Sequence, residues 1–320
     1  MDFALLIDNL TNPALLFFIL GILAVCVKSD LEIPGTSSKF ISLYLLFSIG
    51  FKGGQELSHE AFSSEILFSM IFGVAIALII PIYSFFLLRK RLSVYDSVAL
   101  AAAYGSVSAV TFVTASSYLE TMGLTLHGHM VAMMALMESP AIIAGLVLLF
   151  LFNKKNKKEV SMKNVLKHSL TNGSVILITG SLIVGLIADA KQAEGIKPFT
   201  DDIFKGFLAI FLLDMGIISG RKLNSLIKKG WFPFVFAVFM PLANGIAFGL
   251  LSSFVTDDIS NRFIFAILAA SASYIAVPAA MKITVPKANP GLYLPMALAV
   301  TFPVNITIGM PIYFMVIQQV

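Results

Sequence analysis

Two stretches decide the fold of this chain: AAAYGSVSAVT at residues 101–111 and LAASASYIAVPA at residues 268–279. Each places small and polar residues at the middle of an apolar segment that is long enough to cross a membrane. Glycine, serine and proline weaken a helix locally, so both segments are predicted to be broken helices. The second stretch follows the first at an offset of 166–168 residues, which indicates two related halves.

The composition of the whole chain indicates a membrane protein. Of its 320 residues, 58% are hydrophobic and only 12% are charged, and the mean hydropathy is +0.91. Soluble domains carry about 25% charged residues, so a soluble enzyme and a disordered scaffold are both excluded. The long continuous apolar runs predict an all-α polytopic membrane protein. The net charge of +4 is assigned to membrane topology rather than to nucleic-acid binding.

Ten membrane-crossing segments are predicted. They are Pro13–Val27, Phe40–Phe51, Ile66–Leu88, Ser97–Tyr118, Met130–Phe152, Val175–Ala188, Ile203–Ser219, Trp231–Val255, Phe263–Val285 and Leu292–Ile317. Alternating the connections places 17 of the 22 Lys and Arg residues on one side and 5 on the other. The positive-inside rule makes the 17-residue side cytoplasmic, so both termini are expected outside the cell inner (plasma) membrane.

A basic linker at residues 153–168 separates two halves of five segments each, residues 1–152 and 169–320. Because five is odd, the halves enter the membrane from opposite sides and are predicted to form a 5+5 inverted repeat. Two further matches support the repeat. The stretch SIGFKGG at 48–54 aligns with DMGIISG at 214–220, and Pro140 aligns with Pro303 at an offset of 163 residues.

The two predicted breaks are the candidate binding site. The first turn of a helix is electropositive, so the helix ends that follow Ser106–Ser108 and Ser273–Ala276 are predicted to hold an anion. Hydroxyls at the breaks, together with the intramembrane carboxylate Glu138, are predicted to hold a cation. The alternative is that the small residues serve only close helix packing, which is the interpretation preferred for the GxxxG of Gly245 and Gly249.

Several other polar residues leave alternatives open. Asp214 is either a functional carboxylate or an ion-pair partner of Lys205 or Lys52. The polar residues of segment ten either line the site or join helices, and they are Thr301, Asn305 and Thr307.

His127 and His129 have HxH spacing, but no third ligand is visible, so no metal site is predicted beyond a possible sodium ion. The single cysteine, Cys26, is expected to be a buried apolar filler. The serines are central and the histidines lie at segment ends, and neither HExxH nor a nucleotide fingerprint occurs. No enzyme and no cofactor are predicted.

The chain resembles the SbtA-type sodium-dependent bicarbonate transporter family over nearly its whole length. The stretches that carry the resemblance are IGFKGG (49–54), YGSVSAVT (104–111), MESPA (137–141), DMG (214–216), AASASYIAVPA (269–279) and VPKANPGLY (285–293). The resemblance implies a core domain built on broken helices four and nine, which moves against a gate domain made from segments one, two, six and seven. It also implies sodium coupling, bicarbonate as substrate, a homotrimer and control by a cytoplasmic PII-like protein.

The resemblance assigns site residues to both breaks. The first broken region corresponds to Gly105, Ser106, Val107, Ser108 and Thr111, and the second to Ser271, Ser273 and Ala276. Where the family has an SSSDISGP-like stretch, this chain has SASYIAVP, with Tyr274 at the acidic position.

These assignments predict two overlapping residue sets. The substrate set is Gly105, Ser106, Val107, Ser108, Thr111, Ser273, Tyr274 and Ala276, and the cation set is Ser106, Ser271, Ser273 and Glu138. The predicted function is secondary active transport of a small anion, with sodium-coupled bicarbonate uptake by alternating access favoured. The alternatives are a cation-coupled transporter of a small organic anion and a membrane receptor that does not transport.

Overall fold

The computed structural model describes residues 11–152, 171, 173–227 and 229–320. Within these residues all regular structure is helical, as predicted. The predicted linker at 153–168 lies outside the described residues, so its boundaries and its side of the membrane stay predictions.

The first half contains α2 (Pro13–Cys26), α3 (Gly35–His59), α4 (Ser64–Leu88), α5 (Val94–Gly105), α6 (Ala109–Thr121) and α7 (Gly128–Phe152). The second half begins with α9 (Gly173–Ile187), α10 (Ala190–Glu194), the π-helical turn η1 (Pro198–Asp202), α11 (Phe204–Ile227), α12 (Trp231–Leu251) and the 3-10 turn η2 (Ser252–Phe254). It ends with α13 (Ile259–Ala270), α14 (Ala276–Thr284), α15 (Pro290–Pro295), η3 (Met296–Thr301), α16 (Phe302–Val304), η4 (Asn305–Gly309) and α17 (Met310–Gln318).

Six helical stretches are long and apolar enough to cross a membrane. They are Ser64–Leu88, Val94–Thr121, Gly128–Phe152, Pro198–Leu223, Trp231–Phe254 and Pro290–Gln318. Three shorter apolar helices accompany them, at Pro13–Cys26, Gly173–Ile187 and Ile259–Ala270. These apolar helices are those of a multi-pass membrane protein. The count of ten membrane-spanning segments stays a prediction.

Segments two and seven are longer than their apolar runs indicate. The predicted segment Phe40–Phe51 is the middle of α3, which continues through Lys52 and Gln55 to His59. In the same way, α11 extends past the predicted end at Ser219 to Ile227. Lys, Gln and Glu are good helix formers, so a helix does not end where its hydrophobicity ends. Cys26 is exposed rather than buried, because the last turn of α2 turns it away from the neighbouring helix.

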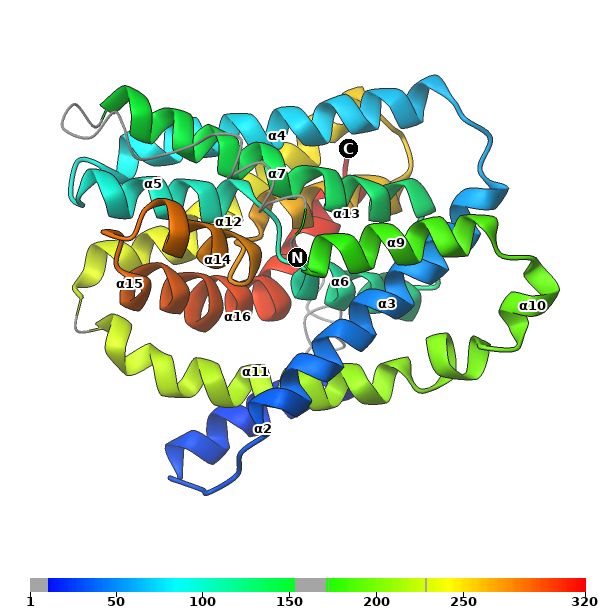
Figure 1. The fold of residues 1–320 in the computed structure, drawn as a ribbon, viewed down its shortest axis with the longest axis horizontal. Helices are drawn as coiled ribbons and strands as arrows, with labels where there is room; N and C mark the ends of the chain where they lie inside the picture. Colours follow the sequence, from blue (N-terminus) through cyan, green and yellow to red (C-terminus); the bar gives the residue numbers. More distant parts are fainter. Residues whose placement is uncertain (1–10, 153–170, 172, 228) are drawn as a thin grey trace.

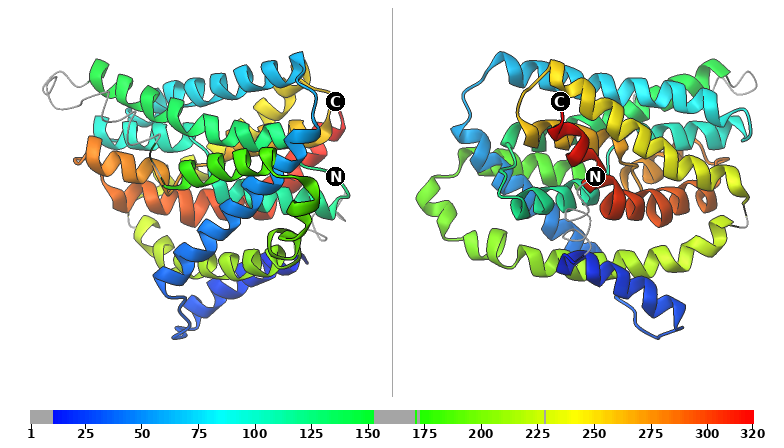
Figure 2. Two further views of the ribbon diagram at one scale, coloured as in Figure 1. Left: turned by 45° about the vertical axis from the view of Figure 1, so that its right-hand side comes forward. Right: turned by 180° about the vertical axis from the view of Figure 1, so that it is seen from behind.

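The helices form two groups (Figure 1). The peripheral group consists of α2, α3, α9 and α11, in which α3 contacts α9 and α11 contacts α2. The central group consists of α4 to α7 and α12 to α17. Figure 2 shows from two further sides that α2 and α11 lie along one edge of the central group, while α3 runs obliquely from that edge toward α4. The broken segments α5–α6 and α13–α14 lie in the central group, and α5 and α13 are buried over almost their whole length.

Two glycine crossings hold the peripheral group together. A Cβ added to Gly21 of α2 would collide with the Leu213 carbonyl of α11, and one added to Gly216 would collide with the Phe18 carbonyl of α2. The backbones of α2 and α11 therefore touch directly, which only glycine permits.

The second crossing joins α3 to α9 in the same way. A Cβ on Gly54 would collide with the Leu182 carbonyl, and one on Gly185 would collide with the Phe51 carbonyl. Each crossing thus pairs one helix of the first half with one helix of the second.

Candidate functional site

Both predicted interruptions are present. α5 ends at Gly105 and α6 begins at Ala109, while α13 ends at Ala270 and α14 begins at Ala276. Ser106 and Ser271, the first residues beyond α5 and α13, have extended backbones with ψ angles of 175° and 164°. The small polar residues therefore stop each helix inside the protein, where the surrounding helices cover the freed backbone.

The two breaks are hydrogen-bonded to each other. The Ser108 N–H donates to Ser271 Oγ at 3.1 Å, and the Ser273 N–H donates to the Ala103 carbonyl at 2.8 Å. Residues 163 to 170 positions apart are thereby fixed side by side, as the paired stretches in the sequence indicate. Ser271 Oγ also donates to the Leu268 carbonyl at 2.9 Å, so this hydroxyl is fully engaged in joining the breaks.

The helix that follows each break is capped by a serine. Ser108 Oγ accepts the Thr111 N–H at 3.2 Å, and Ser273 Oγ accepts the Val277 N–H at 3.3 Å. These bonds satisfy one free amide in each first turn, while the helix dipole keeps both ends electropositive. The predicted hydroxyls of Ser108 and Ser273 therefore shape the two helix ends.

Two buried oxygens in this region have no hydrogen-bond partner among the described residues. They are Ser106 Oγ at the first break and Glu138 Oε2 of α7. Leaving a buried polar atom unpaired costs about 1–3 kcal/mol, so such atoms are candidate ligand contacts.

Glu138 lies at the depth of the first break. Gly145 of α7 faces Ala102 of α5, since a Cβ on Gly145 would lie 2.8 Å from the Ala102 Cβ. The chain reverses direction between α6 and α7, so α5 and α7 are antiparallel. Glu138 lies seven residues before Gly145, about 10 Å along α7, and therefore beyond the end of α5. Helix α7 also contacts α14, so Glu138 belongs to the helix that joins both broken segments.

The remaining predicted residues are buried. Gly105 faces Pro81 of α4, whose ring would collide with any Cβ at position 105. The side chains of Val107, Thr111 and Ala276 are each at most 4% exposed.

A cavity of about 360 Å³ reaches the second break from one side. Tyr274 and Ile275 form part of its wall, opposite residues of the peripheral group. The peripheral lining includes Ser38, Lys39 and Ser42 of α3 with Met215 and Lys222 of α11. Because Lys39 and Lys222 belong to the predicted basic side, we call this the inner cavity.

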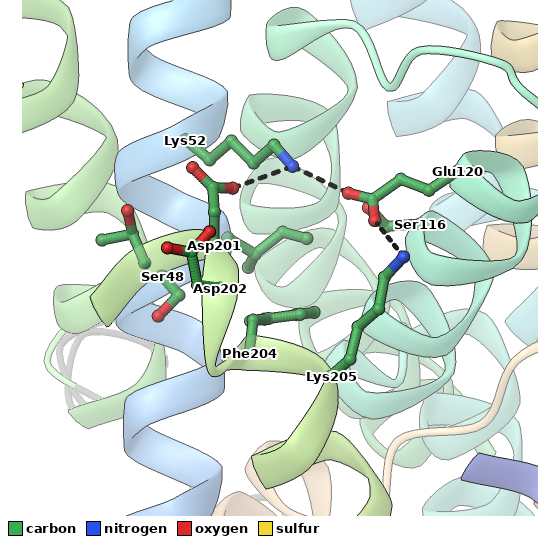
Figure 3. Close-up of a pocket in the computed structure, with 10 residues that line it drawn as sticks. Ser48, Lys52, Ser116, Glu120, Asp201, Asp202, Phe204 and Lys205 are labelled. Carbon is green, nitrogen blue, oxygen red and sulfur yellow. Dashed lines mark hydrogen bonds and ion pairs between the residues drawn. The ribbon is translucent and has the colours of Figure 1, made fainter. Parts of the chain in front are cut away.

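A second cavity of about 400 Å³ lies at the opposite end of the boundary between the two groups, and we call it the outer cavity (Figure 3). Lys52 of α3 is 2.7 Å from Glu120 of α6 and 3.0 Å from Asp201 of η1. Lys205 of α11 approaches Glu120 at 3.5 Å. We call these three ion pairs the outer latch: the two pairs to Glu120 connect the peripheral group to α6, and the third joins α3 to η1.

The outer latch is not predicted by the sequence. Lys52 and Lys205 are possible partners of Asp214 by sequence, but their ion pairs go to Glu120 and Asp201. Asp214 itself is 3% exposed, and its Oδ2 has no hydrogen-bond partner within the described part of the chain. No sequence signal distinguished Glu120 and Asp201 from other charges in connections.

Two of the three polar residues of segment ten, Thr301 and Asn305, join helices. Thr301 Oγ1 donates to the Ala237 carbonyl at 2.8 Å and therefore accepts the Tyr104 hydroxyl, also at 2.8 Å. Asn305 Nδ2 donates to the Ala270 carbonyl at the end of α13, and its Oδ1 accepts the Tyr313 hydroxyl. Thr307 donates to the Pro303 carbonyl in its own helix.

The glycines of α12 have the packing role that was predicted for them. A Cβ on Gly245 would collide with the Tyr313 ring, and one on Gly249 would lie 3.0 Å from Ala266 and 3.1 Å from Ile317.

Comparison with protein families gives one match. The chain matches the Na⁺-dependent bicarbonate transporter superfamily over residues 13–318, a span that runs from the first residue of α2 to the last residue of α17. Among curated proteins, no significant match was found.

Proposed function

Because the chain belongs to the Na⁺-dependent bicarbonate transporter superfamily, we propose that it is a secondary active transporter that takes up bicarbonate with sodium. The observation that carries this proposal is the pair of helix breaks hydrogen-bonded to each other in the buried centre, with the inner cavity reaching Tyr274. Two helix ends that meet inside a membrane protein suit a small anion, since each presents free amides and a positive dipole end.

The proposed anion site lies between the N-terminal ends of α6 and α14. Residues 105–108 with Thr111 form its first wall, and Ser273, Tyr274 and Ala276 form the second. Ser108 and Ser273 each accept one first-turn amide, those of Thr111 and Val277, which leaves other first-turn amides of α6 and α14 for a ligand.

The proposed sodium site uses oxygen ligands at the same level. Ser106 Oγ and Glu138 Oε2 are buried without partners, and a hard cation prefers hydroxyl, carbonyl and carboxylate oxygens. Ser271 and Ser273 contribute through the backbone that their hydroxyls position. The cation offsets the cost of burying the anion, which couples the two bindings.

Alternating access follows from the two ends of the boundary between the groups. The outer latch holds the peripheral group against α6, while the inner cavity separates α3 and α11 from Tyr274 and Ile275. In this proposal the described arrangement is the state in which the outer latch is formed and the inner cavity reaches the second break. Movement of the central group against the peripheral group would break the latch and close the inner cavity.

The glycine crossings support the proposed 5+5 inverted repeat. Gly21 and Gly185 occupy equivalent places at an offset of 164 residues, and Gly54 and Gly216 do so at an offset of 162. Exchanging the two halves converts the α2–α11 crossing into the α9–α3 crossing. The plasma-membrane location with external termini is part of the proposal and rests on the distribution of basic residues. The homotrimer and the PII-like regulator are also part of it and rest on the resemblance.

Uptake by proteoliposomes tests the function. We expect labelled bicarbonate to accumulate only with an inward sodium gradient, and a Glu138→Gln variant to shift the sodium dependence. Accumulation of a small organic anion instead of bicarbonate would support the second candidate substrate on the same site. Saturable binding of either anion without flux would contradict transport and indicate a receptor.

A further inference from the structure

Three connections that are far apart in the sequence meet at the outer end of the molecule. Glu60 directly follows α3, His127 and His129 flank the first residue of α7, and Asp258 is the N-cap of α13. None of these residues lines the inner or the outer cavity. The fold therefore places the Glu60 carboxylate beside the HxH pair, although Glu60 precedes His127 by 67 residues in the chain.

The side chains of this cluster converge on one point. His129 Nδ1 lies 2.7 Å from Glu60 Oε2, and His127 Nδ1 lies 3.7 Å from Glu60 Oε1. One ligand atom from each of the three residues lies within 4.8 Å of the other two. A metal ion with bonds of about 2.0–2.2 Å fits such a triangle after a small inward movement of the side chains.

Two further contacts orient the ligands. The Gly128 N–H donates to Glu60 Oε1 at 2.6 Å and holds the carboxylate toward the imidazoles. His127 Nε2 lies 3.5 Å from Asp258 Oδ2, on the side of the ring opposite to Nδ1. A carboxylate at the outer nitrogen of a histidine fixes its tautomer and leaves the inner nitrogen free to bind metal.

We propose that Glu60, His127 and His129 form a binding site for a divalent transition metal of the zinc class. Two imidazoles and one carboxylate are the protein ligands of open zinc sites, in which water takes the fourth position. His129 is 4% exposed and its ring is fixed, whereas the His127 side chain is 38% exposed and leaves room for that water. Asp258 is a positioning residue that acts through His127.

The site connects the two helix groups. Glu60 is attached to α3 of the peripheral group, while both histidines are attached to α7 of the central group. A bound metal would hold the outer ends of these helices together.

Zinc binding to the full chain tests the proposal independently of transport. Purified protein without a polyhistidine tag is treated with chelator and titrated with ZnCl₂ by calorimetry, and Co²⁺ absorption reports the ligand geometry. We expect one equivalent of Zn²⁺ to bind and the cobalt complex to show the strong visible bands of a tetrahedral site. His127→Ala and His129→Ala should each abolish both signals, and Asp258→Asn should weaken binding by about 10-fold or more.

His59→Ala is the matched control, because His59 is the exposed last residue of α3, directly before Glu60, and lies outside the cluster. It should bind zinc like the unmodified chain. If one variant fails to fold, the other histidine variant and Asp258→Asn decide the result. Absence of saturable zinc binding, or equal affinity in His59→Ala and the cluster variants, would overturn the site and indicate ion pairing alone.

Discussion

The two broken segments differ in how the helix after each break is held. α6 is fixed at both ends, because Ser108 caps its first turn and Glu120 in its last turn belongs to the outer latch. The first turn of α14 is also bonded to a serine, Ser273, but Ile275 directly before the helix is 41% exposed and lies in the wall of the inner cavity. Similar sequences therefore produce similar breaks, but the neighbouring helices decide which break is enclosed and which one meets the cavity.

The largest effect is expected from filling either break. Ser108→Leu and Ser273→Leu should each abolish uptake, because they remove a cap and insert a large side chain where the structure is close-packed, which alone costs about 1–3 kcal/mol. Thr179→Leu is the control, since it changes a hydroxyl residue at an exposed position of α9. Uptake by proteoliposomes is measured for each variant, and its size-exclusion elution in detergent is measured as a check of folding. Normal uptake by both break variants would show that the breaks serve packing only.

Thiol labelling should separate the two breaks. In a chain whose Cys26 is replaced by serine, Ile275→Cys should react with a polar thiol reagent applied to the inner side, whereas Val107→Cys should be protected. Ile275 is 41% exposed and Val107 is 1% exposed, so the rates should differ by about 10-fold or more. Equal rates in inside-out vesicles would remove the difference between the breaks on which the comparison rests.

Weakening the outer latch should have a smaller effect. Glu120→Gln removes two of the three ion pairs, each partly exposed and worth about 0.2–1 kcal/mol. The outward-open state should gain population, so labelling of Ile275→Cys from the inner side should slow by about 2- to 5-fold. Asp202→Asn is the control, because Asp202 lines the same cavity and forms none of the latch pairs. An unchanged rate in Glu120→Gln would mean that the latch does not restrain the two groups.

The smallest effect concerns the first halves of the broken segments. α5 begins with a Ser93 hydroxyl cap, whereas Asp258 at the start of α13 faces His127. Asp258 and Glu60 raise the pKa of His127 from 6.5 to about 10. A raised histidine pKa gives stability that is fully present below pH 6.5 and is lost as the pH rises toward 10. Solvent screening limits this contribution to about 1 kcal/mol or less, so the unfolding temperature should fall by about 2 °C between pH 7 and pH 9.

The measurement is thermal unfolding in detergent with a chelator present. His127→Gln should flatten the pH dependence, and His59→Gln should keep it. The carboxylate of Glu60 makes stability depend on pH in the opposite direction. Burial would raise the pKa of Glu60, but hydrogen bonds from His127 and His129 lower it. Its contribution is present at neutral pH and is lost on acidification. A slope that persists in His127→Gln would assign the dependence to another group.

The sequence predicts local helix geometry better than it predicts partners. The breaks at 106–108 and 271–275 follow from glycine, serine and proline within apolar segments, because these residues act directly on the backbone. The ends of α3 and α11 do not follow, because polar helix formers continue a helix past its apolar run. The aligned glycine stretches place Gly50 opposite Gly216, whereas the crossings make Gly54 its equivalent, one helical turn away. Which glycine contacts a carbonyl of the facing helix depends on how the two helices pack, so the sequence of one helix alone does not predict it.

The same limit applies to side-chain partners. Glu120 and Lys52 are 68 residues apart, and Glu60 and His129 are 69 residues apart. Their meeting depends on how the peripheral and central groups assemble, so charge patterning along the chain did not reveal either pair.

The glycine crossings have a mechanical consequence for the transport cycle. Where two backbones touch without side chains between them, there are no rotamers to rearrange and no interdigitating atoms that could slide into a second arrangement. The α2–α11 and α3–α9 pairs therefore act as stiff cross-braces, and the peripheral group resists internal shear. If the protein works by the proposed alternating access, its movement would therefore be concentrated at the border between the peripheral and central groups.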